Sequence, residues 1–192
     1  MLKKMRGFTL IEMLIVVAII GILAALLIPN AMSALQRAKQ KGTTKDVNTI
    51  ATGLMDYVTD RGNVPAHTGA LQANDAVVAA LQGFYLKVVP LNDQWGNPFY
   101  VYTRDACDGV YGITLLGDET WGDDDFVVAS NGRDGQEGPT YEYNPNDPSA
   151  GLYEVKAMKD FNEDIVNWNG NIVVGPRTAA GTGAGTGTGT GS

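Results

Sequence analysis

The chain has 192 residues, of which 44% are hydrophobic and 18% are charged. This composition suits one globular domain of about 100 to 150 residues with additional segments. The 21 acidic residues outnumber the 14 basic ones, and the net charge of -7 argues against nucleic acid as a partner, because phosphate binding needs clustered Lys and Arg. Cys107 is the only cysteine, so no intrachain disulfide can reinforce the fold.

A long apolar segment begins close to the N-terminus. Residues 1–7 carry three basic side chains, and residues 8–29 form a 22-residue run in which Glu12 is the only ionisable side chain. Twenty helical residues rise by about 30 Å, the thickness of a bilayer's hydrocarbon core. The basic residues favour a cytoplasmic N-terminus. An ordinary signal peptide is cleaved after its apolar run, whereas here the polar junction between Gly7 and Phe8 precedes it, so cleavage there would retain the helix.

Glu12 is unusual because it is a carboxylate within this apolar run. Placing such a group in a membrane costs about 2.5–3.5 kcal/mol on insertion scales, so it usually has a partner. Glu12 lies one helical turn from the cytoplasmic end and could simply reach the lipid headgroups. The alternative is a positively charged partner in a neighbouring subunit.

Residues 6–14, Arg-Gly-Phe-Thr-Leu-Ile-Glu-Met-Leu, resemble the prepilin peptidase motif of type IV pilins and pseudopilins. In that family the peptidase cuts after the glycine that matches Gly7 and methylates the new amine of the residue that matches Phe8. The resemblance implies that this amine pairs with Glu12 of the previous subunit in the apolar core of a filament. Removal of either partner would leave a buried charge unpaired.

The helical pattern continues beyond the apolar run. Pro29 lacks an N–H donor and crowds the preceding turn, so we expect a kink or local melting over residues 26–29 rather than an end. Residues 30–62 are predicted to form an amphipathic half of the same helix, and residues 60–63, Asp-Arg-Gly-Asn, predict its end. Its apolar face, which we expect to carry the head, comprises Leu35, Ala38, Val47, Ile50, Ala51, Leu54, Tyr57 and Val58.

Residues 63–177 are predicted to form the globular head. A short helix is expected over residues 76–81. Runs rich in aromatic and β-branched residues at 99–103, 111–115 and 126–129 are separated by Gly and Asp clusters, which predicts an antiparallel meander. The expected fold class is therefore α+β, with a long N-terminal helix packed on a small antiparallel β-sheet as in pilins.

Residues 93–100, Asp-Gln-Trp-Gly-Asn-Pro-Phe-Tyr, resemble the Asp-x-Trp-Gly-x-Pro-Tyr segment that precedes the sheet in the major pseudopilin of type II secretion. We interpret Trp95 as a core or strand-edge aromatic and residues 96–98 as a turn. His67 and Cys107 have no partners at catalytic or zinc-binding spacing. We therefore expect a structural protein and not an enzyme.

Two later segments, residues 130–135 and 163–168, resemble in order the two halves of the calcium loop of that pseudopilin. Calcium takes six to eight oxygen ligands from carboxylates, carbonyls and water on flexible loops. A bound calcium ion would also tie down a long loop in a protein without a disulfide. Solvated acidic turns are the alternative interpretation.

The resemblance also implies particular calcium ligands. They are the carbonyl of Asn131 and the carboxylate of Asp134 from the first half, with Asp164 or the nearby Asp160 from the second. The connection over residues 136–159 is longer than is usual in the family, which leaves the exact ligands open. Residues 178–192 form a Gly/Thr tail with almost no apolar surface to bury, and this composition predicts disorder.

Taken together, the resemblance implies a major pseudopilin that polymerises into the pseudopilus of a type II secretion system. The alternative is a major type IV pilin for adhesion or motility, although most such pilins close a C-terminal loop with two cysteines. The implied partners are other copies of the chain, minor pseudopilins, the inner-membrane assembly platform with its ATPase, and prepilin peptidase. The implied location is the bacterial inner membrane, with one membrane pass and a periplasmic head, and then the periplasmic pseudopilus.

Overall fold

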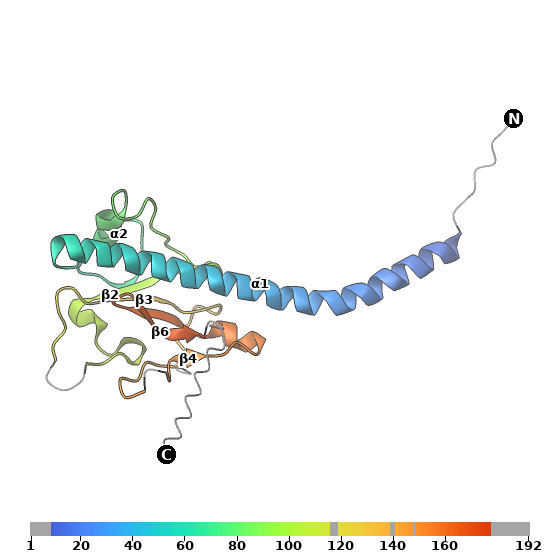
Figure 1. The fold of residues 1–192 in the computed structure, drawn as a ribbon. Coiled ribbons are helices and arrows are strands. Elements are labelled where there is room, and N and C mark those ends of the chain that lie inside the picture. The colour runs from blue at the N-terminus through green and yellow to red at the C-terminus, as the bar shows by residue number, and fades with distance from the viewer. Residues whose placement is uncertain (1–8, 116–118, 139–140, 148, 178–192) are drawn as a thin grey trace, which may run out of the picture. The chain divides into compact units, whose positions relative to one another are not determined.

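The computed structural model describes residues 9–115, 119–138, 141–147 and 149–177; the predicted leader, Phe8 and the Gly/Thr tail lie outside these ranges. The chain forms two compact units, with the boundary after Ala38. The helices are α1 (Leu10–Arg61), α2 (Ala76–Leu81) and the 3-10 turns Arg104–Cys107, Val110–Gly112 and Met158–Asn162. The strands are β1 (Thr68–Ala70), β2 (Tyr100–Thr103), β3 (Phe126–Ser130), β4 (Leu152–Tyr153), β5 (Ile165–Trp168) and β6 (Asn171–Pro176) (Figure 1).

The described part of the first unit is the N-terminal half of α1. The helix continues through Pro29, as the sequence predicts. The side-chain amide of Asn30 donates to the carbonyl of Leu26 at 3.3 Å, and the hydroxyl of Ser33 donates to the carbonyl of Asn30 at 2.9 Å. These side chains add hydrogen bonds next to the position where proline removes one. Residues 26–29 stay helical, so local melting, one of the two expected effects of Pro29, does not occur here.

The C-terminal half of α1 belongs to the second unit, the head. It ends at Arg61, where Gly62 adopts a left-handed φ of +74° and donates its N–H to the carbonyl of Val58 at 2.7 Å. This is a glycine C-cap and confirms the predicted end. The buried residues of α1 are Gln40, Thr43, Val47, Ile50, Ala51, Gly53 and Leu54. Leu35 and Ala38 are exposed instead, because they precede the head.

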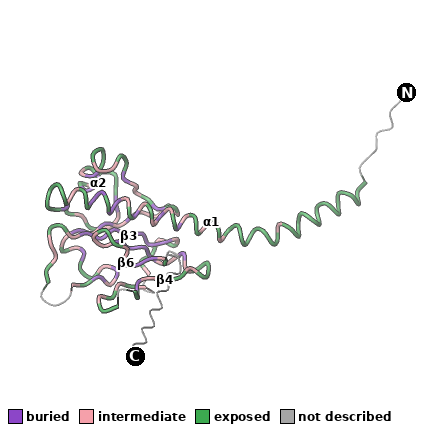
Figure 2. The backbone as a smooth tube through the Cα atoms, viewed as in Figure 1, coloured by how far each residue is buried: buried purple, intermediate pink, exposed green. Residues whose placement is uncertain are grey.

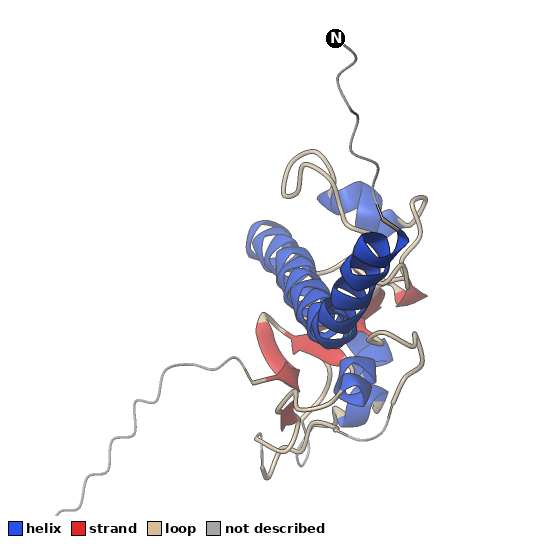
Figure 3. Cartoon of the chain, turned by 90° about the vertical axis from the view of Figure 1, so that its right-hand side faces the viewer, coloured by secondary structure: helices blue, strands red, loops and turns tan. Residues whose placement is uncertain are grey.

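The head contains a six-stranded sheet in the order β1-β2-β3-β5-β6-β4. All neighbouring strands are antiparallel except β4 and β6, which are parallel. Figures 1 and 3 show the sheet on one side of the C-terminal half of α1 and α2 on the other. The α+β, pilin-like fold class is confirmed, as are the short helix α2 and the strands β2 and β3.

The predicted strand over residues 111–115 is wrong. Tyr111 lies in a 3-10 turn with φ 52° and ψ 31°, and Gly112 also has a positive φ of 74°. Two successive left-handed residues reverse the chain and cannot belong to an extended strand. The apolar pattern still reports burial correctly, since Tyr111 and Ile113 lie in the core.

Both faces of the sheet are covered, which explains why every residue of β3 is buried. Alternate side chains point to opposite faces, with Phe126 and Val128 directed to α1 and Val127 and Ala129 directed away from it. The first core also contains Val47, Ile50, Leu54, Val77, Leu81, Phe99, Val101 and Ile165. The second contains Cys107, Tyr111, Ile113, Val166 and Val174, flanked by Trp121, Tyr143 and Trp168. Figure 2 shows these buried positions in the head, while the N-terminal half of α1 is mostly exposed.

Candidate assembly helix and cation-binding loop

The N-terminal half of α1 presents apolar side chains around its whole circumference. Nearly every residue over 10–30 is exposed in the single chain. Leu10, for example, is 85% exposed and Leu26 67%. Among the described residues, α1 is the one helix long and apolar enough to cross a membrane. A helix that is hydrophobic on all sides must be covered by lipid or by other protein.

Glu12 has a local hydrogen-bond partner in Thr9. One carboxylate oxygen of Glu12 accepts the backbone N–H of Thr9 at 2.9 Å and its hydroxyl at 2.7 Å, and the N–H of Glu12 donates to the same hydroxyl at 3.3 Å. These reciprocal contacts form a capping box at the start of α1. The signal for this role in the sequence is the Thr-x-x-Glu spacing, which the comparison with pilins alone does not bring out. Gly7 and Phe8 lie outside the described residues.

The segment that resembles the pseudopilin Asp-x-Trp-Gly-x-Pro motif is a docked turn. One carboxylate oxygen of Asp93 accepts the N–H groups of Trp95 and Asn97 at 2.9 Å each, and the other accepts the hydroxyl of Ser130 at 2.9 Å. The side-chain amide of Asn97 donates to the carbonyl of Gly132 at 2.8 Å. We call residues 130–135 and 163–168 the first and second acidic segments. The turn therefore holds the base of the first acidic segment, and this role is structural.

The two segments that resemble a calcium loop lie against each other. Ser130 pairs with Ile165 between β3 and β5. Just before the second segment, the carbonyl of Phe161 accepts the N–H of Arg133 at 2.8 Å, and the side chain of Asn162 accepts the guanidinium N–H of Arg133 at 2.9 Å. Gly132 has a φ of +61°, and a Cβ there would lie 2.6 Å from the carbonyl oxygen of Asn162. Glycine is therefore required both by conformation and by space. Residues 165–168 of the second segment form the strand β5.

The predicted ligands occupy different environments. The side-chain oxygen of Asn131 accepts the hydroxyl of Tyr111 at 2.7 Å, and Asp134 is exposed, with its carboxylate accepting the N–H of Gln136 at 3.1 Å. Asp160 accepts two backbone N–H groups at 2.7 Å, at the start of the 3-10 turn Met158–Asn162. These backbone hydrogen bonds lower the pKa of Asp160. Its carboxylate thus has a local role in shaping the turn.

Asp164 differs from the other acids because it is buried and incompletely paired. It is 2% exposed, one oxygen accepts the N–H of Gly138 at 3.0 Å, and the other has no hydrogen-bond partner among the described residues. Burial, together with repulsion from Glu137, Glu163 and Asp134, raises the pKa of Asp164 to about 7. A buried carboxylate oxygen without a partner, surrounded by negative charge, is an environment that a divalent cation would stabilise.

The donors around Asp164 suit calcium better than a transition metal. Within the described ranges, no three His, Cys, Asp or Glu side chains lie together closely enough to hold a metal ion. Calcium accepts carbonyl and water oxygens in place of side chains, whereas zinc needs nitrogen or sulfur ligands. The residues present therefore fit calcium only if main-chain carbonyls from the two segments complete the ligand set.

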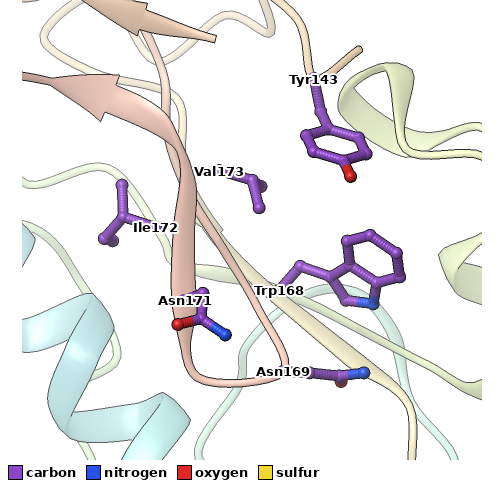
Figure 4. A pocket seen from close by; sticks show the side chains of 6 residues that line it. All are labelled: Tyr143, Trp168, Asn169, Asn171, Ile172 and Val173. Carbon is purple, nitrogen blue, oxygen red and sulfur yellow. The ribbon is translucent and has the colours of Figure 1, made fainter. Parts of the chain in front are cut away.

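The surface hollow in Figure 4 has no charged side chain among the described residues that line it. It is lined by Tyr143, Trp168, Asn169, Asn171, Ile172 and Val173. The rings of Tyr143 and Trp168 are 5.5 Å apart in an edge-to-face contact, and Asn169 donates to Asp125 at 2.6 Å. The imidazole Nε2 of His67 lies 3.6 Å from the carboxylate of Asp75, and Cys107 is fully buried.

The fold and the N-terminal motif define the class of protein as a pilin-like filament subunit. A family model for the prokaryotic N-terminal methylation motif matches residues 2–28, and one for type II secretion system (T2SS) protein G matches residues 30–125. The chain belongs to the protein G family, the major pseudopilins of type II secretion systems, which are structural subunits and not enzymes.

Three relatives illustrate this family membership. The type II secretion system core protein G of Pseudomonas aeruginosa is 36% identical over 122 residues, which cover 60% of this chain and 84% of that protein. The Vibrio cholerae protein of the same name is 31% identical over 146 residues, covering 71% and 90% of the two chains. The Dickeya chrysanthemi protein is 27% identical over 167 residues, covering 87% and 88%. The comparison with solved structures gives no match.

Proposed function

We propose that the chain polymerises into a periplasmic pseudopilus that drives folded proteins across the outer membrane. The observation that carries this proposal is the exposed apolar half of α1, in a chain of the protein G family. Packing these helices together in a filament would cover the apolar surface that a single head cannot cover.

Before assembly, residues 8–29 would span the bacterial inner membrane, with residues 1–7 in the cytoplasm and the head over residues 63–177 in the periplasm. Prepilin peptidase would cut between Gly7 and Phe8 and methylate the new amine. The ATPase, acting through the inner-membrane platform, would then add subunits to the filament base, where minor pseudopilins also take part.

Assembly would use Glu12 as the partner of the Phe8 amine of the next subunit. The capping contact with Thr9 is a competing local role for the same carboxylate. Two variants separate these roles. Glu12→Ala removes both, whereas Thr9→Val removes the capping hydroxyl and keeps the carboxylate. We expect Glu12→Ala to insert and be cleaved but to form few pseudopili, and Thr9→Val to assemble. Normal filament yield from Glu12→Ala would contradict the pairing role.

Calcium would be held by Asp164, together with the Asn131 carbonyl and Asp134. When bound, the ion would neutralise the acidic loop and cross-link its two segments. Asp160, whose carboxylate already accepts two backbone N–H groups, is the weaker candidate. The test is the melting temperature of the full chain in detergent with excess calcium or with a chelator. A rise with calcium is expected, and equal melting temperatures would contradict the site.

A further inference from the structure

The long connection between the two acidic segments places Tyr153 at the base of the proposed calcium site. Tyr153 lies on β4 within residues 136–159, and it is 2% exposed. Its carbonyl accepts the N–H of Arg177 at 2.7 Å, which anchors β4 beside β6. A Cβ at Gly151 would collide with the carbonyl oxygen of Val173, so glycine is required for this close approach. The position of Tyr153 is thus set by the sheet.

The hydroxyl of Tyr153 joins α1 to the second acidic segment. It lies 3.2 Å from the carbonyl oxygens of both Glu163 and Asp164, and the side-chain amide of Gln40 donates to it at 3.5 Å. Gln40 and Tyr153 are both buried. A hydroxyl has one proton to donate and lone pairs to accept, so it can donate to these carbonyls while it accepts from Gln40. Burial raises the pKa of Tyr153 well above its usual value, which keeps the hydroxyl protonated.

Asp164, whose main-chain carbonyl contacts Tyr153, also carries the carboxylate proposed to bind calcium. The carbonyl of Asp164 is fixed by Tyr153, while its side chain reaches the N–H of Gly138 at 3.0 Å. Asp164 is therefore held from the side of α1 through its backbone and from the connection over residues 136–159 through its side chain. We infer that the Tyr153 hydroxyl is a positioning group that aims the Asp164 carboxylate for cation binding. This inference rests on the calcium site proposed above.

The alternative is that Tyr153 only fills the core and does not position Asp164. The neighbouring Tyr141 distinguishes the two roles, because its ring stacks on that of Tyr153 at 5.0 Å between centroids. No hydrogen bond of the Tyr141 hydroxyl is found among the described residues. Tyr153→Phe and Tyr141→Phe therefore each remove one hydroxyl from the same stacked pair, and only the first removes contacts to the acidic segment.

The experiment is calorimetric titration of the full chain in detergent with calcium chloride, at a temperature where all variants are folded. We expect Tyr153→Phe to weaken calcium binding about tenfold, equal to about 1.4 kcal/mol, and Tyr141→Phe to leave it unchanged. The rise in melting temperature caused by calcium should shrink in Tyr153→Phe alone. If that variant does not fold, Gln40→Met takes its place, with an expected weakening of about threefold because it removes only the donor to the hydroxyl.

The outcomes separate the two proposals. Unaltered calcium affinity in Tyr153→Phe, or in Gln40→Met if it is used, would overturn the positioning role and leave the calcium site standing. Equal weakening by Tyr153→Phe and Tyr141→Phe would overturn it too, since the cause would then be the ring stack. Absence of calcium binding by the native chain would overturn the calcium site itself.

Discussion

Replacement of Asp164 by Asn should remove the loss of stability that this carboxylate causes in the calcium-free head as the pH rises. The pKa of Asp164 is raised from 3.8 to about 7. The unfolded chain thus loses this proton near pH 4 and the folded chain near pH 7, so the group makes calcium-free stability fall between these values and contributes no further change above about pH 7. At about 1.4 kcal/mol per pKa unit, the loss approaches roughly 4 kcal/mol. Asp164→Asn removes this loss.

Urea unfolding of the full chain in detergent, followed by tryptophan fluorescence, would measure this effect. Without calcium, Asp164→Asn should match the native chain near pH 4 and exceed it at pH 8, by up to roughly 4 kcal/mol. With calcium at pH 8 the native chain should regain stability and the variant should not. Asp160→Asn is the matched control, because its carboxylate is not buried and it should leave this pH dependence in place. The same change in stability between pH 4 and pH 8 in the native chain and in Asp164→Asn, both without calcium, would refute the reasoning.

Two substitutions and one labelling experiment test the packing of the head. Gly132→Ala places a Cβ at a positive φ and against the Asn162 carbonyl, so unfolding experiments should show a loss of about 1–3 kcal/mol or more. Leu54→Ala opens a cavity in the core between α1 and the sheet, and the same assay should show a loss of about 2–5 kcal/mol. Cys107 is fully buried, which raises its pKa to about 12, so iodoacetamide at pH 8 should modify it only after unfolding, as mass spectrometry would report. Rapid labelling of the folded chain would contradict this burial.

The elements with strong local signals were predictable from the sequence. The apolar run, the spacing from Val47 to Leu54 and the Gly62 stop define α1, because helical periodicity and a left-handed cap are local properties. The strands β2 and β3 were also predictable, since both are short runs of aromatic and β-branched residues.

The remaining features depend on contacts between distant residues. The short strands β1 and β4 follow from pairing with β2 and β6 and have little pattern of their own. Residues 111–115 are predicted as a strand because their apolar side chains indicate burial. Burial does not fix the backbone conformation, and both Tyr111 and the adjacent Gly112 are left-handed. Gln40 and Thr43 are polar and yet buried, because Tyr153 and the N–H of Gln94 supply their partners. The calcium ligands and the pairing of Glu12 with Phe8 stay predictions.

The role of the chain in protein secretion is most directly tested by comparing proteins in the culture medium of the native strain and of a strain that lacks this chain. A secretion pseudopilus predicts that particular exoproteins disappear from the medium, accumulate in the periplasm, and return to the medium when the chain is restored. Unchanged exoproteins, together with loss of surface fibres or motility, would contradict the secretion role and make the chain the subunit of a surface pilus.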